Sequence, residues 1–141
     1  MKSTNSNKSL SVKGFYDKKT GTISYVASDI SSQKCAIIDS VLDFDFSSGS
    51  MDYINADKII DFVKDNNLTV EWLIETHVHA DHLSASPYIQ KQLGGKIGIS
   101  AKISEVQNLF GKTFNAGTEF QRDGSQFDYL FQDEDEYKIG E

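Results

Sequence analysis

Three histidines and an aspartate lie close together in the segment Thr76-His77-Val78-His79-Ala80-Asp81-His82. The chain has only 3 histidines, and all of them fall in this segment. In extended chain, residues two apart point the same way, so His77, His79 and Asp81 can face one site. His82 departs from that alternation and needs a bend to join them. Neutral imidazole and carboxylate groups suit zinc, iron or manganese, so the spacing predicts a metal site with one or two metal positions.

The sequence leaves two roles open for Asp81. It can bind a metal directly, or it can act as the catalytic residue that orients a metal-bound water, whose pKa the metal lowers to about 7. The competing interpretation is a solvated loop in which Asp81 caps the next helix. The full His-x-His-x-Asp-His pattern after an apolar strand favours the metal site.

Strands are predicted on both sides of this motif. Residues 69–74 are rich in β-branched and aromatic side chains and form the predicted strand that leads into the motif. Residues 35–38 predict a second buried strand, which ends at Asp39. Residues 12–16 and 22–27 predict a hairpin, because apolar and polar side chains alternate on either side of a glycine-containing turn.

Helices are predicted between these strands. The first is expected to take Asn55 as its N-cap and to stop at Asn66-Asn67; its apolar residues 56, 59, 60 and 63 have helical spacing. The second is expected to start at Ser86-Pro87, with Ser86 as the N-cap. The remaining predictions are a polar loop over 42–53, a strand at 97–99, a helix around 103–110, an irregular stretch over 111–135 and the start of a strand at 136–139. This alternation after a hairpin predicts an α+β fold with a mixed sheet and flanking helices.

Composition limits the classes of function that remain. The 141 residues suit one domain, predicted over 12–141 after a disordered polar tail over 1–11. The net charge is −7, from 14 basic and 21 acidic residues, which argues against nucleic acid and anionic membranes as partners. The single cysteine, Cys35, excludes an intramolecular disulfide and is expected to be a buried small residue. No apolar run approaches the roughly 18–20 residues of a membrane span, and no signal peptide is evident, so a cytoplasmic location is expected.

The motif resembles the signature of the metallo-β-lactamase superfamily, and the likeness runs from Val12 to the C-terminus. Within that superfamily, the chain resembles the β-lactamase-like hydrolases related to persulfide dioxygenases and to glyoxalase II. The resemblance implies an αβ/βα sandwich with its active site at the sheet edges, of which this chain is similar to the N-terminal half. Besides the motif, the segments that carry the likeness are 24–27, 35–39, 69–72, 83–85, 94–99 and 114–120.

The resemblance implies two alternative chemistries. Persulfide dioxygenases use one ferrous iron to oxidise glutathione persulfide to sulfite; His77 would then be the iron ligand, and His79 would lie either behind the metal ligands or on the substrate side. Glyoxalase II-like members use two metals to hydrolyse a glutathione thioester; His77 and His79 would then bind the first metal, and Asp81 and His82 the second. The dioxygenase is the leading hypothesis. The expected cofactor is a divalent metal, iron or zinc, and the expected substrate is a small molecule such as a glutathione derivative.

Both of these family sites use later ligands. The dioxygenase site takes a later histidine and a later aspartate, whereas no histidine occurs from Leu83 to Glu141. We therefore expect a homodimer or a complementing second half, and we expect Ile37, Ile38, Leu73 and Ile74 to need a partner surface. The alternative from a different class is a truncated, non-catalytic half-domain that binds metal at most.

Overall fold

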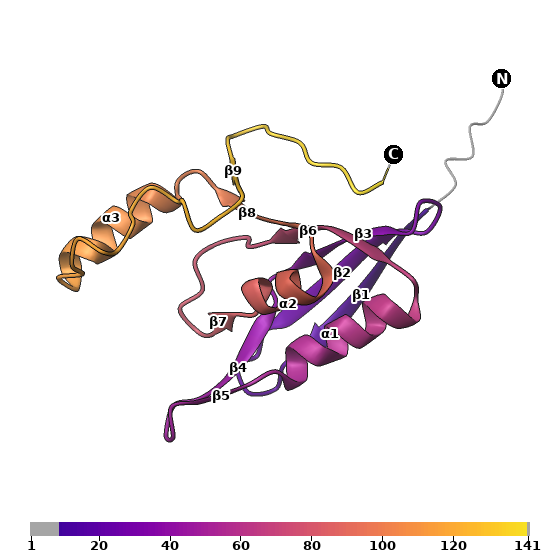
Figure 1. Cartoon of the computed structure of the whole chain (residues 1–141), viewed down its shortest axis with the longest axis horizontal. Coiled ribbons are helices and arrows are strands. Elements are labelled where there is room, and N and C mark those ends of the chain that lie inside the picture. Colours follow the sequence, from indigo (N-terminus) through magenta and orange to yellow (C-terminus); the bar gives the residue numbers. More distant parts are fainter. Residues whose placement is uncertain (1–8, 141) are drawn as a thin grey trace.

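The computed structural model describes residues 9–140, and its largest element is a six-stranded sheet (Figure 1). The first three strands pair antiparallel and the last four run parallel, which confirms the predicted mixed sheet. In spatial order the strands are β1 (Leu10–Tyr16), β2 (Ile23–Asp29), β3 (Lys34–Ile38), β6 (Thr69–Ile74), β8 (Lys96–Ser100) and β9 (Tyr129–Phe131).

A smaller sheet and the helices complete the described chain. The small sheet contains β5 (Ser50–Asp52), β4 (Val41–Asp45) and β7 (Leu83–Ser84), in that order. The helices are α1 (Ile54–Asp65), α2 (Ser86–Leu93) and α3 (Ile103–Thr113). Figure 1 shows α1 and α2 together on one face of the large sheet, whereas α3 projects away from it. None of the helices in the described chain has the length and apolar character that crossing a bilayer requires.

The main core lies between the large sheet and the pair α1 and α2. Helix α1 buries the four apolar residues that its spacing predicted, Ala56, Ile59, Ile60 and Val63. The same core contains Ile37 of β3 and Leu73 of β6. The expectation that these two side chains need a partner surface is therefore wrong, because helices of the same chain cover them. Each fully buried isoleucine or leucine here contributes about 1.5–3 kcal/mol to stability.

The opposite face of the large sheet is apolar as well. Strand side chains alternate between faces, so Tyr25 lies opposite the core residue Val26. Tyr25 pairs with Ile38, and Ile38 pairs with Ile74, which forms an apolar row across three strands. At the edge strand β1, Val12 on the same face is 57% exposed. Ile74 is itself buried, so the expectation that it needs a partner surface is also wrong, and the exposed apolar part of this face consists of Val12 and Tyr25.

Strand β1 begins earlier than the sequence predicted. Leu10 and Ser11 pair with Asp29 and Ser28, so these residues extend the hairpin. Their assignment to a disordered tail over 1–11 is wrong, because the ladder with β2 continues through them. Residues 1–8 of that expected tail lie outside the described residues.

The predicted polar loop over 42–53 is a hairpin instead. Strands β4 and β5 pair antiparallel, with Asp43 opposite Asp52 and Asp45 opposite Ser50. The turn between them is held by Asp45, whose carboxylate accepts the N–H of Ser47 at 2.9 Å. The serines and aspartates of this segment concealed these strands, although in β4 the apolar Leu42 and Phe44 alternate with Asp43 and Asp45.

The starts of the helices differ from the predicted caps. Tyr53 is the residue before α1 and makes no side-chain cap bond; the N–H of Asn55 instead donates to Asp43 Oδ2 at 2.8 Å. Ala85 occupies the N-cap position of α2, and Ser86 is the first helical residue. Both cap predictions are wrong for one reason. The sequence did not show that carboxylates elsewhere in the chain would accept hydrogen bonds from the Asn55 N–H and from the Ser86 hydroxyl. Asp43 binds the start of α1, and the Ser86 hydroxyl binds a glutamate described below.

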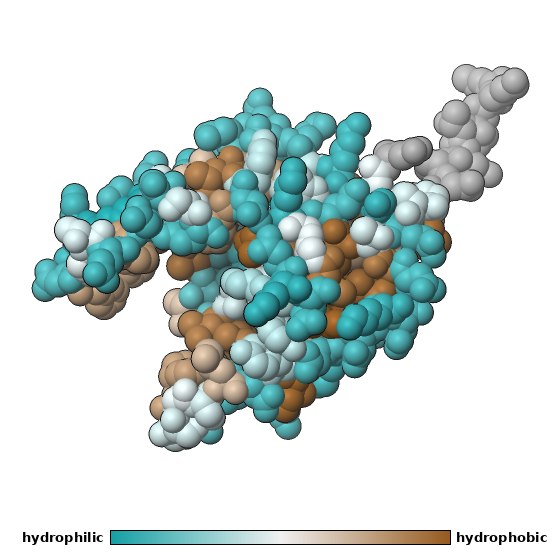
Figure 2. Space-filling view, viewed as in Figure 1, coloured by the Kyte–Doolittle hydropathy of each residue, from teal (hydrophilic) through white to brown (hydrophobic). Residues whose placement is uncertain are grey.

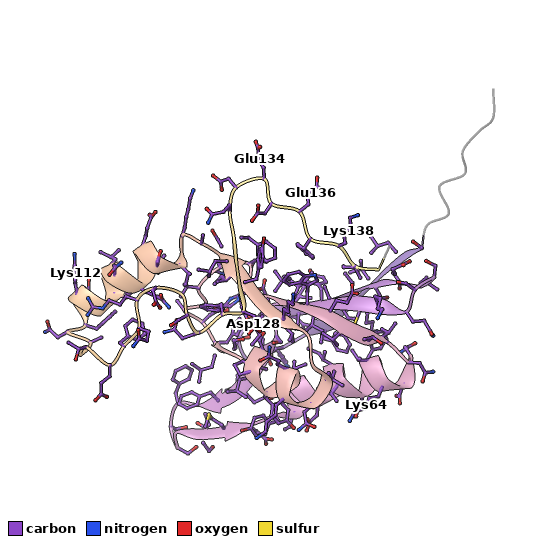
Figure 3. All side chains as sticks on the ribbon, turned by 45° about the horizontal axis from the view of Figure 1, so that its top comes forward. Lys64, Lys112, Asp128, Glu134, Glu136 and Lys138 are labelled. Carbon is purple, nitrogen blue, oxygen red and sulfur yellow. The ribbon has the colours of Figure 1, made fainter. Side chains whose placement is uncertain are left out.

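The segment after α3 is irregular except for β9. The predicted strand at 136–139 is wrong, and the strand lies at Tyr129–Phe131, beside β8. Asp128 explains the register, since its carboxylate accepts the Ile97 N–H at 2.8 Å. Tyr137 packs on the Trp72 ring, with the ring centroids 5.7 Å apart. Figure 3 shows the charged side chains of this segment, Glu134, Glu136 and Lys138, on the outside of the molecule.

Candidate metal centre

The candidate site lies where the parallel strands β3 and β6 end. Ile38 pairs with Ile74, so the next residues, Asp39 and Glu75, leave the sheet side by side. The Asp39 N–H donates to the Ile74 carbonyl at 2.9 Å. Asp39 has a φ of 52°, in the left-handed region that aspartate and asparagine occupy more readily than most residues. Carboxyl ends of parallel strands are the usual place for a binding site in such sheets.

The Asp39 carboxylate binds the beginning and the middle of the histidine motif. Its Oδ1 accepts the Thr76 N–H at 2.8 Å, and its Oδ2 accepts the Thr76 hydroxyl at 2.6 Å. Oδ1 also lies 2.9 Å from Nε2 of His79. An ionised carboxylate only accepts hydrogen bonds, so Nε2 of His79 carries the proton in this contact. Nδ1 of His79 is thereby left with a lone pair for a metal.

Glu75 is the second carboxylate beside His79. It is 5% exposed, and its Oε1 accepts the hydroxyls of Ser84 and Ser86. Its Oε2 lies 3.2 Å from Nε2 of His79. This contact with Glu75 raises the pKa of His79; burial opposes the rise, and the charge of Asp39 adds to it.

His77 stands on the exposed side of the site. Its Nδ1 lies 2.8 Å from the Thr76 hydroxyl, and its ring centroid lies 4.3 Å from that of His79. Asp39, His77 and His79 have potential ligand atoms within 4.8 Å of one another. Because both Asp39 oxygens already accept hydrogen bonds from Thr76, Asp39 is better suited to orienting His79 than to binding a metal.

His82 is the buried residue of the motif, and the exposed Asp81 lies beside it. Asp81 Oδ2 lies 3.2 Å from Nδ1 of His82 and accepts the Thr22 hydroxyl at 2.9 Å. The contact with His82, followed by that with Thr22, lowers the pKa of Asp81 to about 2. His79, Asp81 and His82 form a second group with ligand atoms within 4.8 Å, so the two groups share His79.

A metal ion fits this set of donors. His82 is 8% exposed, and its buried Nε2 has no hydrogen-bond partner among the described residues. Buried polar atoms nearly always have a partner, so this nitrogen indicates a ligand that binds there. Three imidazoles and a carboxylate are ligands for zinc and for ferrous iron. His77, His79, Asp81 and His82 thus converge as the motif suggested, and their binding of metal stays a prediction.

Two pockets flank the histidines. One, of about 480 Å³, is lined by Glu75 and the three histidines on one side and by apolar side chains of β8 and α3 on the other. The second, of about 580 Å³, lies between the motif and the β4 strand and includes Lys19 and Phe44. Figure 2 shows a hollow between α3 and the rest of the molecule, with hydrophobic side chains along its border. The first pocket offers an apolar environment directly beside the candidate ligands.

The sequence interpretation did not include several residues of this site. Glu75 and Thr22 contact the motif directly, and Ser84 and Ser86 hold Glu75. One signal was available for Glu75: it follows a predicted buried strand, as Asp39 does, and ends of adjacent parallel strands meet. No comparable signal marked Thr22, because its contact with Asp81 joins positions 59 residues apart.

The chain belongs to the metallo-β-lactamase superfamily. The sequence model described as the metallo-beta-lactamase superfamily matches residues 20–137, which include the motif, the helices and strands β2 to β9. The fold is therefore metallo-β-lactamase-like, with a mixed sheet and flanking helices, as the resemblance implied.

Individual proteins with similar sequences or folds agree with this assignment. A protein of Burkholderia pseudomallei named a probable metallo-hydrolase is 50% identical over 131 residues, 93% of this chain and 45% of that protein. Glyoxylase B2 of Dictyostelium discoideum is 40% identical over 129 residues, 89% of this chain and 44% of that protein. The crystal structure of ETHE1 from Myxococcus xanthus matches with a TM-score of 0.65 and 21% identity, over 92% of this chain and 44% of that one. This chain thus spans less than half the length of the relatives described.

Proposed function

We propose that this chain carries the histidine-rich part of an iron-dependent site that oxidises a small-molecule persulfide, such as that of glutathione. The observation that carries the proposal is the convergence of three imidazoles beside an apolar pocket, with the buried Nε2 of His82 lacking a partner among the described residues. The resemblance to the persulfide dioxygenase branch supports a persulfide as the substrate. The match to ETHE1 supports the fold.

The residues present have distinct roles under this proposal. His77 would hold the iron, as the resemblance implies, and the geometry adds His79 as a further candidate ligand, because Asp39 keeps it in the tautomer with a free Nδ1. A divalent metal supplies Lewis-acid chemistry, and iron supplies redox chemistry in addition. The apolar wall from β8 and α3 excludes water around a substrate, which strengthens the electrostatic contacts inside the site.

A metallo-hydrolase acting on a thioester is the second candidate function. The specific observation for it is the second ligand group, His79, Asp81 and His82, which provides donors for a second metal. The relative named a probable metallo-hydrolase supports the same class. In this case zinc is the metal, and Asp81 orients the attacking water. The two candidates thus differ in the number of metals bound and in the need for oxygen.

We further propose that a second copy or a complementing chain completes the ligand set. No histidine follows His82 in this sequence, and the exposed Val12 and Tyr25 lie on the sheet face away from α1 and α2. Sheets pack about 10 Å apart through such faces. Size-exclusion chromatography with light scattering tests this: a well-folded monomer that binds metal fully would contradict it.

Metal content is the first test of the proposed function. The chain is loaded with iron or with zinc, dialysed, and analysed for metal by mass spectrometry. We expect near-stoichiometric metal that is lost in His77→Ala. We expect Asp81→Ala to lose metal as well, and Asp133→Ala, which removes an exposed carboxylate far from the motif in sequence, is its matched control. Loss of all metal from the wild-type chain on dialysis would contradict the proposal.

Activity then separates the two candidates. Oxygen consumption with glutathione persulfide by the iron-loaded chain supports the dioxygenase. Thioester cleavage by the zinc-loaded chain, without oxygen uptake in either form, supports the hydrolase and overturns the leading proposal. The assays use the chain in the oligomeric state that light scattering establishes.

A further inference from the structure

Glu75 is the most deeply buried carboxylate at the site, and the proposed metal chemistry leaves it without a role. It is 5% exposed at the end of β6. Burial of an ionised carboxylate is unfavourable unless its oxygens are bound. Two hydroxyls, from Ser84 of β7 and Ser86 of α2, donate to the same oxygen, Oε1. The side chain is therefore anchored at one oxygen by two separate elements.

The other oxygen of Glu75 faces His79. Oε2 lies 3.2 Å from Nε2 of His79, and it has no donor in hydrogen-bonding geometry among the described residues. The same Nε2 is 2.9 Å from Asp39 Oδ1. Two carboxylates thus approach one ring nitrogen, from the ends of two neighbouring strands. A single N–H bonds well to one of them, and the second stabilises the same proton electrostatically.

We propose that Glu75 is a positioning residue that acts with Asp39 to keep the proton of His79 on Nε2 and the Nδ1 lone pair free for a metal. This inference rests on the proposed metal centre. Carboxylates behind a ligating imidazole fix its tautomer and its ring orientation, and their loss typically weakens metal binding 10–100-fold. Here two carboxylates, those of Asp39 and Glu75, lie behind the same imidazole. The hydroxyls of Ser84 and Ser86 hold Oε1 of Glu75, so that Oε2 stays directed at His79.

The serine contacts make a sharp substitution available. In Glu75→Gln, the Ser84 and Ser86 hydroxyls keep the amide oxygen on their side, so the amide NH2 group faces His79 Nε2. Two donors then oppose each other, which favours the tautomer with the proton on Nδ1. A purely structural role for Glu75 would not change which ring nitrogen carries the proton. The tautomer is therefore the readout that separates positioning from support of the fold.

The experiment uses the full-length chain, labelled with ¹⁵N and freed of metal by chelation. Two-bond ¹H–¹⁵N correlation spectra at about pH 9, where imidazoles are neutral, report the protonation of each ring nitrogen. We expect wild-type His79 to have protonated Nε2 and unprotonated Nδ1, and Glu75→Gln to reverse or average this pattern. Zinc affinity, measured by competition with a chelator, is expected to fall 10–100-fold in the same variant. Glu71→Gln, a glutamate of the same strand whose carboxylate binds the Gly140 N–H, is the matched control.

The results test the positioning role of Glu75 independently of the proposed metal-dependent function. An unchanged His79 tautomer in a folded Glu75→Gln chain overturns it. If Glu75→Gln does not fold, Ser86→Ala decides the matter: averaged ring signals support the inference, and an unchanged pattern overturns it. Because the spectra are recorded without metal, a wild-type chain that fails to bind zinc or iron would instead refute the proposed metal site.

Discussion

Asp39 and His79 are 40 positions apart in the sequence, yet the carboxylate Oδ1 of one lies 2.9 Å from Nε2 of the other. The contact exists because β3 and β6 are adjacent and parallel, so the residue after β3 reaches the loop that follows β6. It selects the nitrogen of His79 that remains available to a metal. The pairing of two strands thus sets the chemistry of the motif.

Two replacements of Asp39 separate the effect of its charge from the effect of its hydrogen-bond acceptors and backbone conformation. Asn tolerates the φ of 52° and retains an oxygen for Thr76 and His79, so Asp39→Asn should lower the free energy of unfolding by only about 1 kcal/mol. We expect its zinc affinity to fall about tenfold, since the negative charge behind the His79 ring is lost. Asp39→Ala loses the acceptors and places a side chain without polar atoms in a left-handed conformation, which costs about 3 kcal/mol.

Urea unfolding and competition with a chromophoric chelator measure the two effects. Asp133→Asn, at an exposed position, is the control and should change neither quantity. Zinc affinity that is equal in wild type and Asp39→Asn would show that the contact with His79 does not assist metal binding.

The sequence predicted an element correctly where the contacts that stabilise it lie close together in the sequence, and less well where they join distant segments. Helix α1 was predicted because Ala56, Ile59, Ile60 and Val63 carry their own periodic signal. Its start was mispredicted, because the group that binds the Asn55 N–H is Asp43, 12 positions earlier. Strands β4 and β5 were missed because serines and aspartates dominate residues 43–52, although Val41, Leu42 and Phe44 of β4 are apolar and the two strands pair with each other.

The candidate site divides in the same way. Local spacing identified His77, His79, Asp81 and His82, since residues of one short loop converge without help from distant segments. Glu75 was not identified, because its place after a predicted strand was its one signal and the contacts of Ser84 and Ser86 that fix it form only in the folded chain. Side chains that orient ligands come from other elements, so they become visible only in the folded chain.

The stability of the metal-free chain should depend on pH through His79. Its folded-state pKa lies above the ordinary value of 6.5, mainly because of the contact with Glu75. The folded chain therefore binds this proton more tightly than the unfolded chain. The resulting stabilisation is fully present below about pH 6.5 and is lost as the pH rises through the folded-state pKa. We expect the difference in unfolding free energy between wild type and His79→Gln to be larger at about pH 6 than at about pH 9.

Urea titrations of both chains in the presence of a chelator provide this comparison. Subtracting the His79→Gln curve removes the contributions of the other titratable groups. A difference between the two chains that does not vary with pH would contradict the tighter proton binding by folded His79.

Cys35 should be inert to thiol reagents in the folded chain. Its side chain is fully buried, and burial, with a smaller effect of the nearby Glu71 charge, raises the pKa of the thiol to about 12. Because the thiolate is the reactive form, labelling at about pH 8 should proceed only through unfolding. A chromogenic disulfide reagent should detect one thiol per chain in urea and almost none in buffer. Rapid labelling of the folded chain would show that β3 opens locally.

Thr22 is expected to support the ligand group of His79, Asp81 and His82 from outside the motif. Its hydroxyl donates to Asp81 Oδ2 at 2.9 Å and lies 3.3 Å from Nδ1 of His82. Thr22→Val removes both contacts but keeps the β-branched shape that suits the end of the hairpin. Because the shape is kept, the melting temperature should change little. Zinc affinity should fall about tenfold, because His82 loses a group that fixes its ring. Thr113→Val, which removes a hydroxyl bond to the Leu109 carbonyl at the end of α3, is the matched control. If both variants bind zinc as tightly as the wild-type chain, the hairpin does not contribute to the orientation of Asp81 and His82.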